Sequence, residues 1–244
     1  AAHPYPVVFL HGLGANSSED INQLQSAVAA NGYCTYSLTY GTGVYGPQVG
    51  GVADVTQSAG QITSFIEQVL GETHATKADL VGHSEGGFES LYVPKTQGIA
   101  SQIDKVVAIA PPTHGTTFGG LYGLAMALGA QALVGQTMTT FGCVACGELV
   151  VGGSGVNTLD NGPIAQPGVS YTIITSRDDE MVTPTDTAFV AEIGVVNEYV
   201  QDLCPNDPVG HIGEAYDTNV LNMVENALDP AQAASFICSA GSPG

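Results

Sequence analysis

A serine between two glycines is the residue of this chain best placed for chemistry. It lies in the segment Asp79–Gly87, where an apolar run leads into Gly-His-Ser-Glu-Gly. A Gly-x-Ser-x-Gly sequence between a strand and a helix is typical of a nucleophile elbow, a sharp turn that raises a serine hydroxyl above a parallel sheet. The amino terminus of the following helix would favour a developing anion. The pentapeptide also occurs in plain turns, so its context decides, and that context makes Ser84 the candidate nucleophile.

A histidine must take the proton of this serine, and a carboxylate must orient that histidine. After such an elbow the acid comes first in the chain and the histidine second. His211 is the only histidine in the last part of the sequence, so it is the candidate base. The acid should follow a late strand, for which Tyr171–Thr175 is the candidate, and the acidic residues beyond it are Asp178, Asp179 and Glu180. We predict that Asp179 is the acid, with Asp178 as the alternative.

Two backbone amides have to stabilise the oxyanion of an acyl-transfer intermediate. One belongs to the residue after the nucleophile, which is Glu85. The other comes from a loop after an early strand, and His11-Gly12-Leu13-Gly14 follows the apolar run Val7–Leu10. We predict that Leu13 is the second donor. The carboxyl group of Glu85 must then be hydrogen-bonded or protonated, because a free carboxylate would oppose the oxyanion.

Alternating strands and helices have to position these residues. Apolar runs predict strands at 7–10, 33–38, 78–81, 106–110, 171–175 and 195–200, and helices are expected from Ser17 or Ser18 to 30, and over 52–70, 85–93 and 215–228. This alternation indicates a mostly parallel sheet with helices on both faces. The length of 244 residues suits a single α/β domain over 1–244.

A long segment, residues 113–168, shows no clear strand and is rich in small residues. A connection of this length is usually functional, and we predict a cap or lid over the serine. Leu124 and Leu128 belong to an apolar pattern of near-helical spacing and are candidate substrate contacts, with a core helix as the alternative. His114, at the start of the segment, is a further candidate substrate contact.

The charge of the chain excludes several classes of partner. The net charge is −19 because only four residues are basic. Nucleic acids and anionic membranes need clustered lysine and arginine, so neither is an expected partner. No apolar run reaches the length of about 18 residues that a membrane-spanning helix needs. A secreted mature chain is predicted, with a cytosolic protein carrying free thiols as the alternative.

Taken together, these segments resemble the secreted lipases of the α/β-hydrolase superfamily, in particular the class 2 lipases of actinobacteria and their fungal relatives. The segments that carry the resemblance are 6–14, 31–34, 82–87, 110–116, 143–146, 175–184 and 201–204, up to His211. In that family the acid is the aspartate before Glu-hydrophobic-Val-Thr-Pro, which implies Asp179. The resemblance also implies extracellular hydrolysis of acylglycerols or similar esters, without a metal or other cofactor.

The predicted activity is therefore that of a monomeric triacylglycerol lipase acting on ester or lipid substrates at an oil–water interface, without stable membrane insertion. A cutinase-like polyesterase and a short-chain carboxylesterase are the alternatives within the same chemistry. A non-catalytic lipid-binding homologue is the alternative outside it, since a fold does not fix a function.

Five cysteines are present, which fits an oxidising compartment. We predict disulfides between Cys204 and Cys238 and between Cys143 and Cys146, with Cys34 as a buried thiol on a strand. The first bond would hold the carboxyl-terminal tail near the loop of His211. No metal site is expected, because two cysteines do not complete a tetrahedral zinc site.

Overall fold

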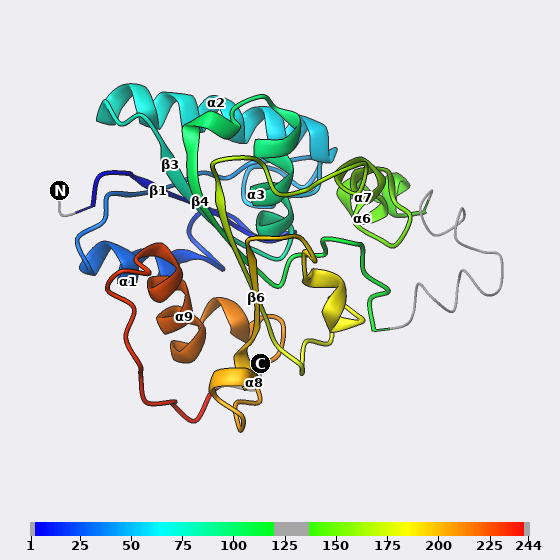
Figure 1. Ribbon diagram of the computed structural model, residues 1–244. Helices are drawn as coiled ribbons and strands as arrows, with labels where there is room; N and C mark the ends of the chain where they lie inside the picture. Colours follow the sequence, from blue (N-terminus) through cyan, green and yellow to red (C-terminus); the bar gives the residue numbers. More distant parts are fainter. Residues whose placement is uncertain (1–2, 120–136, 242–244) are drawn as a thin grey trace.

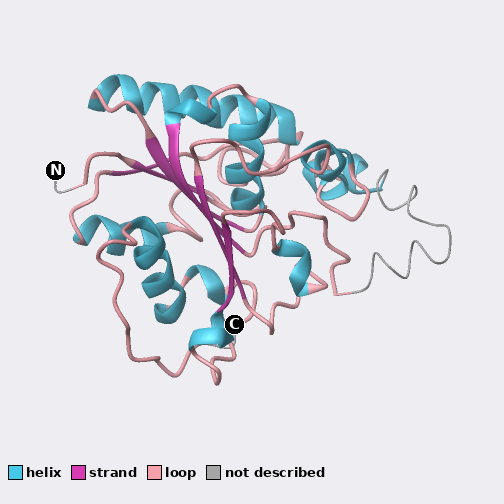
Figure 2. Cartoon of the chain, viewed as in Figure 1, coloured by secondary structure: helices cyan, strands magenta, loops and turns pink. Residues whose placement is uncertain are grey.

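A six-stranded sheet forms the centre of the protein (Figure 2). The computed structural model describes residues 3–119 and 137–241 of the chain. The strands are β1 (Val7–Leu10), β2 (Thr35–Ser37), β3 (Ala78–His83), β4 (Ile103–Ile109), β5 (Ser170–Thr175) and β6 (Val195–Tyr199). Their order is β2-β1-β3-β4-β5-β6, and every neighbouring pair is parallel. All strands therefore end at the same edge of the sheet, where α/β proteins place their sites.

Helices cover both faces of the sheet (Figure 1). The α-helices are α1 (Asn22–Ala30), α2 (Val55–Thr73), α3 (Glu85–Thr96), α6 (Ala145–Glu148), α7 (Ser154–Leu159), α8 (Val200–Leu203) and α9 (Thr218–Leu228), and short 3-10 turns span Ala100–Gln102, Thr185–Ala188 and Gly213–Ala215. Helices α2, α3 and α7 contribute to the core on one face, and α1 and α9 to the core on the other. The observed architecture is thus the predicted α/β arrangement.

Successive side chains along the strands point to opposite faces of the sheet, so the core has two parts, one on each face. Val8 and Leu80 face α2 and α3, whereas Val7, Phe9 and Val81 face α1 and α9. All five side chains are 0% exposed, as expected for a sheet that is covered on both sides. Two packed layers hold the strand ends rigidly, and the strand ends carry the candidate site.

Helix α1 begins later than the sequence predicts. It starts at Asn22, and neither Ser17 nor Ser18 caps it. Asp20 instead has φ of 66°, and its carboxylate accepts a hydrogen bond from the amide of Gly12. The residues before α1 therefore belong to the strand-end loops and not to the helix.

Between 113 and 168, the described residues contain helices and one isolated bridge, from Thr116 to Val150. The assignment of a cap to this segment, and of a single domain to the whole chain, stays a prediction. Leu124 and Leu128 fall within 120–136 and so lie outside the described residues.

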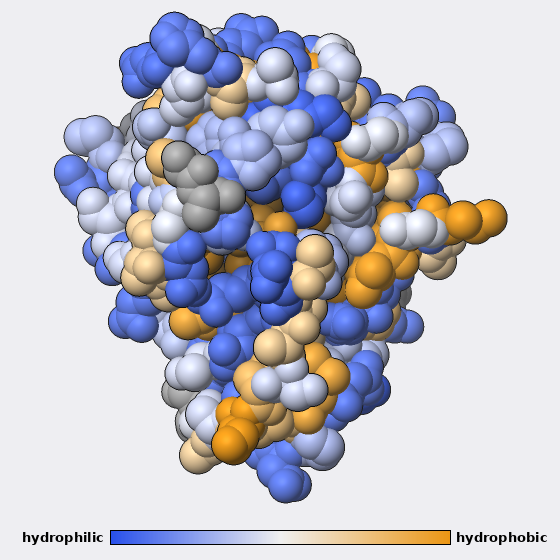
Figure 3. All heavy atoms as spheres, turned by 60° about the vertical axis from the view of Figure 1, so that its left-hand side comes forward, coloured by the Kyte–Doolittle hydropathy of each residue, from blue (hydrophilic) through white to orange (hydrophobic). Residues whose placement is uncertain are grey.

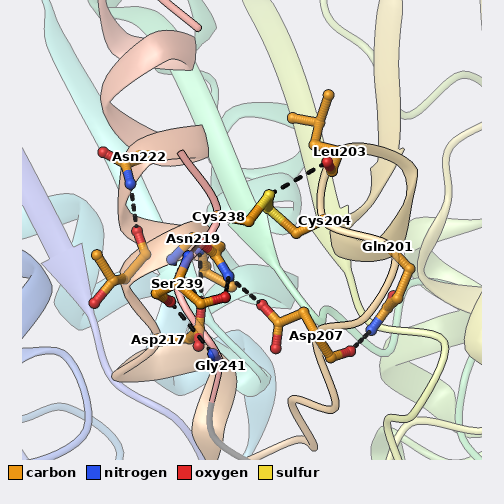
Figure 4. The surroundings of a disulfide bond; sticks show 12 residues. Gln201, Leu203, Cys204, Asp207, Asp217, Asn219, Asn222, Cys238, Ser239 and Gly241 are labelled. Carbon is orange, nitrogen blue, oxygen red and sulfur yellow. Dashed lines mark hydrogen bonds between the residues drawn. A yellow bond between two sulfur atoms is a disulfide. The ribbon is translucent and has the colours of Figure 1, made fainter. Parts of the chain in front are cut away.

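Two disulfide bonds are present, and both pairings match the prediction: Cys143–Cys146 and Cys204–Cys238. The second joins the end of α8 to the carboxyl-terminal tail, close to Asn219 of α9, which donates to the Asp207 carboxylate (Figure 4). Cys34 is the free cysteine, as predicted, but the prediction that it is buried on a strand is wrong, because its side chain is exposed. It precedes β2, a three-residue strand at the edge of the sheet, where no further strand covers it.

On the face drawn in Figure 3, hydrophilic residues predominate and apolar ones gather in small groups. Among the described residues, the search for a helix long and apolar enough to cross a bilayer found none.

Candidate active site

The turn after β3 has the geometry of a nucleophile elbow. Ser84 has φ of 56° and ψ of −121°, and α3 begins at the next residue. Glycine is required on both sides of it: a Cβ atom on Gly82 would lie 2.1 Å from the carbonyl oxygen of Gly86, and one on Gly86 would lie 2.1 Å from that of Leu10. Strand and helix therefore pack backbone against backbone, and the serine is held at the strained corner.

The structure brings Ser84, His211 and Asp179 together. The Nε2 atom of His211 lies 2.9 Å from the Ser84 hydroxyl oxygen, and its Nδ1 atom lies 2.8 Å from Oδ2 of Asp179. The other carboxylate oxygen of Asp179 accepts hydrogen bonds from the amides of Met181 and Val182, at 2.8 and 2.9 Å. Because the carboxylate only accepts, Nδ1 carries the ring proton, and Nε2 is left to accept the proton of the serine.

The neighbouring acids point elsewhere. Asp178 is exposed, and its amide donates to the hydroxyl of Ser176. Glu180 is also exposed, and one of its carboxylate oxygens accepts from the backbone amide of His211. Of the three candidate acids, Asp179 is the one at the histidine ring.

A further acid, Glu214, lies behind the histidine. Its carboxyl oxygen is 4.0 Å from Nδ1 of His211. Burial, and then the charge of Asp179, raise the pKa of Glu214 well above its usual value. No sequence pattern pointed to Glu214, because its position beside His211 follows only from the 3-10 turn before α9.

Within the described part of the chain, only His83, His211 and Glu214 come close enough together to act as a set of metal ligands. The ring nitrogens of His211 face Ser84 and Asp179, and those of His83 also face hydrogen-bond partners. A metal ion would have to displace the nucleophile or the acid, so this group does not fit a metal site.

The two predicted oxyanion donors are both free to donate. Among the hydrogen bonds of the described residues, none is donated by the amide of Leu13 or of Glu85. The peptide that carries the Leu13 amide is fixed through its oxygen, the carbonyl of Gly12, which accepts from Nδ1 of His11 at 2.8 Å and from the amide of Ala15 at 3.2 Å. The amide is thus oriented before any substrate arrives.

His11 is a residue whose role the sequence did not reveal. Burial lowers its pKa below the usual value, against the opposing effects of Gly12 and Asp20. A neutral ring fits its contacts, since Nδ1 donates to Gly12 and Nε2 accepts from the amide of Tyr40 at 3.4 Å. The phenol of Tyr40 stacks on the imidazole, with ring centres 4.4 Å apart. The position of His11 directly before Gly-Leu-Gly was the sequence feature that could have indicated its role in orienting the Leu13 amide.

Two buried acids lie on the oxyanion side of the serine. The carboxyl groups of Glu85 and Glu89, both on α3, are fully buried and form no hydrogen bond with the described residues. Burial raises the pKa of both well above the usual value, and Glu148 adds to the effect at Glu85. The raised pKa favours the protonated form of Glu85, which agrees with the requirement that its side chain not oppose an oxyanion.

A cavity of about 170 Å³ opens above the serine. Its lining, which is mostly apolar, consists of Gly12, Leu13, Ala15, Asp20, His83, Ser84, Pro112, Thr116, Phe118, Leu149, Met181, Val182, His211 and Ile212. His114 is not among these residues. Its ring is partly exposed and lies between the carboxylate of Asp160, at 2.7 Å, and the carbonyl oxygen of Phe189, at 3.0 Å.

Comparison with known proteins agrees with this geometry. A family model described as Lipase (class 2) matches residues 4–211. The chain belongs to this lipase family. Two curated relatives of the class 2 lipase chain, from Pseudarthrobacter phenanthrenivorans and Burkholderia plantarii, are each described as a triacylglycerol lipase and are 33% identical to it over 126 residues. The match covers 48% of this chain but only 36% and 32% of the relatives, so the chain spans about a third of their length.

Solved structures place this class 2 lipase in the α/β-hydrolase fold. Lipase B of Aspergillus fumigatus has a TM-score of 0.71 at 17% identity, over 98% of this chain and 54% of that one. A mature lipase of Bacillus licheniformis has a TM-score of 0.61 at 16% identity, over 95% of both chains. A soluble variant of the monoglyceride lipase of Saccharomyces cerevisiae has a TM-score of 0.62 at 16% identity, over 93% of this chain and 86% of that one. At these identities the likeness establishes the fold alone.

Proposed function

We propose that this chain is a triacylglycerol lipase that cleaves esters through an acyl-enzyme on Ser84. The observation that carries the proposal is the continuous hydrogen-bonded row from the Ser84 hydroxyl through the His211 ring to the Asp179 carboxylate. The description of the curated relatives as triacylglycerol lipases supports the choice of substrate.

The geometry supports the following reaction. The Ser84 oxygen attacks the ester carbonyl carbon while its proton passes to Nε2 of His211, and the carbonyl oxygen, now an anion, accepts from the amides of Leu13 and Glu85. The bond to the alcohol then breaks, and the alcohol leaves with the proton from His211. Water attacks the acyl-enzyme in the same way, with His211 as base, and releases the acid. The Asp179 carboxylate orients the His211 ring and stabilises the imidazolium.

The rim of the cavity supports an apolar substrate. Leu13, Met181 and Ile212 line the cavity and are nevertheless 37%, 41% and 57% exposed. Large apolar side chains around a site favour contact with lipid. We include action at an oil–water interface by a monomer in the proposal, and the two disulfides support secretion into an oxidising compartment.

Hydrolysis of p-nitrophenyl esters from C2 to C16, with and without an emulsified interface, tests the proposal. Wild-type protein should hydrolyse the long esters, and Ser84→Ala should lose about 10⁴-fold or more in rate while its circular dichroism stays unchanged. Near-normal turnover by Ser84→Ala would reject the serine mechanism. A rate confined to short soluble esters would indicate a carboxylesterase, and cleavage of an insoluble polyester in preference to triacylglycerol would indicate a cutinase-like enzyme.

A further inference from the structure

His83 is a buried histidine that the proposed reaction does not use. It ends β3, one residue before Ser84, and is 1% exposed. Its Nδ1 atom lies 2.7 Å from Oδ1 of Asp20, and its Nε2 atom lies 2.9 Å from the backbone oxygen of His211. A carbonyl oxygen can only accept a hydrogen bond, so Nε2 must carry a proton.

Asp20 links this histidine to the loop that carries the oxyanion donor. Its Oδ2 atom accepts a hydrogen bond from the amide of Gly12 at 2.6 Å, while Oδ1 faces His83. The left-handed backbone of Asp20 is held by a hydrogen bond of 2.8 Å from its amide to the Tyr216 hydroxyl. A continuous chain of hydrogen bonds therefore runs from the Gly12 amide through the Asp20 carboxylate and the His83 ring to the backbone oxygen of His211.

Asp20 and His83 form an ion pair. Burial by itself would lower the pKa of His83, but the Asp20 carboxylate and the His211 carbonyl raise it above its usual value. Burial would likewise raise the pKa of Asp20, yet His83 holds it below its usual value. The other ionisable groups that face His83 are Asp179, Glu214 and the His211 ring, whose centre is 4.9 Å away. Both ring nitrogens of His83 thus donate, one to a carboxylate and one to a carbonyl.

We propose that the Asp20–His83 ion pair is a positioning device that sets the separation between the oxyanion donor Leu13 and the base His211. The pair contacts no reacting atom in the proposed reaction. It acts on two backbones, through the amide of Gly12 on one side and the carbonyl of His211 on the other. This inference rests on the proposed function, because it assigns the pair to the transition state of that hydrolysis.

Kinetics with three variants test the proposal. His83→Phe keeps an aromatic ring but removes both hydrogen bonds, and Asp20→Leu removes the carboxylate. Each should lower kcat by about tenfold to a hundredfold with KM changed by less than about threefold, since misplaced groups weaken the transition state and not the binding of substrate. At pH 8, Asp20→Asn should keep kcat within about threefold of wild type, because its amide can donate to Nδ1 of a neutral His83 and its oxygen can accept from Gly12.

A matched control separates positioning from general stability. Ile66→Val, on the buried side of α2, should lower the melting temperature, and Ile66 belongs to a core cluster that contains neither Asp20 nor His83. If His83→Phe and Asp20→Leu lose no more kcat than this control, or if Asp20→Asn is as slow as Asp20→Leu, the positioning role is overturned.

A measurement independent of activity completes the test. In ¹⁵N-histidine-labelled protein at pH 7, both ring nitrogens of His83 should be protonated, and His83→Phe should shift the backbone amide signals of Leu13 and His211 together. A deprotonated nitrogen on His83, or unshifted signals, would overturn the inference even with full activity. If the wild-type protein hydrolyses no ester, the proposed function fails, and these spectra still decide whether the pair joins the two loops.

Discussion

The two sides of Ser84 use the same types of residue in opposite charge states. On the base side, the carboxylate of Asp179 accepts three hydrogen bonds, one from His211 and two from backbone amides. On the oxyanion side, the carboxyl groups of Glu85 and Glu89 are as deeply buried, but no described residue donates to them. Burial raises the pKa of both well above the usual value, which favours their neutral form.

The two strand-end histidines repeat this contrast. His11, at the end of β1, donates to one carbonyl and accepts from one amide, and its pKa is lowered by burial. His83, at the end of the neighbouring β3, faces two acceptors and has a raised pKa. Burial disfavours the charged form of all these groups, and the hydrogen-bond partners and opposite charges within reach decide whether that effect is overcome. The surroundings of these side chains thus favour the neutral form at Glu85, Glu89 and His11 and the charged form at His83.

The largest expected effect on kcat is at Asp179, the acid that contacts the His211 ring. Asp179→Asn should lower kcat by about 10³- to 10⁴-fold, because an amide cannot hold His211 in the tautomer that accepts the serine proton. Asp178→Asn, next to it but exposed, should change kcat by less than about threefold. Steady-state hydrolysis of a soluble ester by both variants checks this pair, and the reverse ranking would reassign the acid.

A smaller effect is expected at the neutral histidine. His11→Phe removes the side-chain donor to the Gly12 carbonyl, which leaves the Leu13 amide less well oriented. One misplaced oxyanion donor should lower kcat by about tenfold to a hundredfold, less than the 10²- to 10³-fold of a lost donor. His3→Phe, which affects a ring stacked on Tyr33 and far from the cavity lining, serves as the control. Equal kcat values for both variants would show that the Gly12 peptide does not need His11.

The smallest effect on activity is expected at a neutral acid. In the folded protein Glu89 retains its proton above its usual pKa of 4.5, whereas the unfolded chain loses it. The folded state then binds more protons, so this group makes the free energy of unfolding fall as the pH rises above about 4.5, by at most about 1.4 kcal/mol per pH unit. Glu89→Gln should remove that slope and change kcat by less than about twofold.

Denaturant unfolding at pH 5, 6, 7 and 8 measures this slope, and Glu67→Gln, an exposed change on α2, provides the reference. If Glu89→Gln and wild type lose stability in parallel, Glu89 is ionised in the folded state, and the contrast between the two sides of the serine does not hold.

The elbow, the grouping of Ser84, Asp179 and His211 and the two disulfides were predictable from the sequence, whereas the pairing of Asp20 with His83 was not. Five residues around Ser84 encode the elbow, because the close approach of strand and helix needs glycine at fixed spacing. Asp178 and Asp179 follow the same strand, and the family pattern agreed with the choice of Asp179, whose carboxylate contacts the His211 ring. The pairing of Asp20 with His83 joins residues 63 positions apart, and Asp20 was assigned to a helix. Propensity favoured that helix, but the contacts of its carboxylate with the strand ends prevailed.

The parallel order of the strands has a practical consequence for attaching this protein to a solid support. Its three lysines are Lys77, Lys95 and Lys105. Lys77 precedes β3, Lys105 is near the start of β4, and Lys95 is in the last turn of α3, which runs back from the elbow. All three amines lie at the end of the sheet opposite to Ser84. Coupling through lysine would therefore leave the mouth of the cavity turned toward the surrounding liquid.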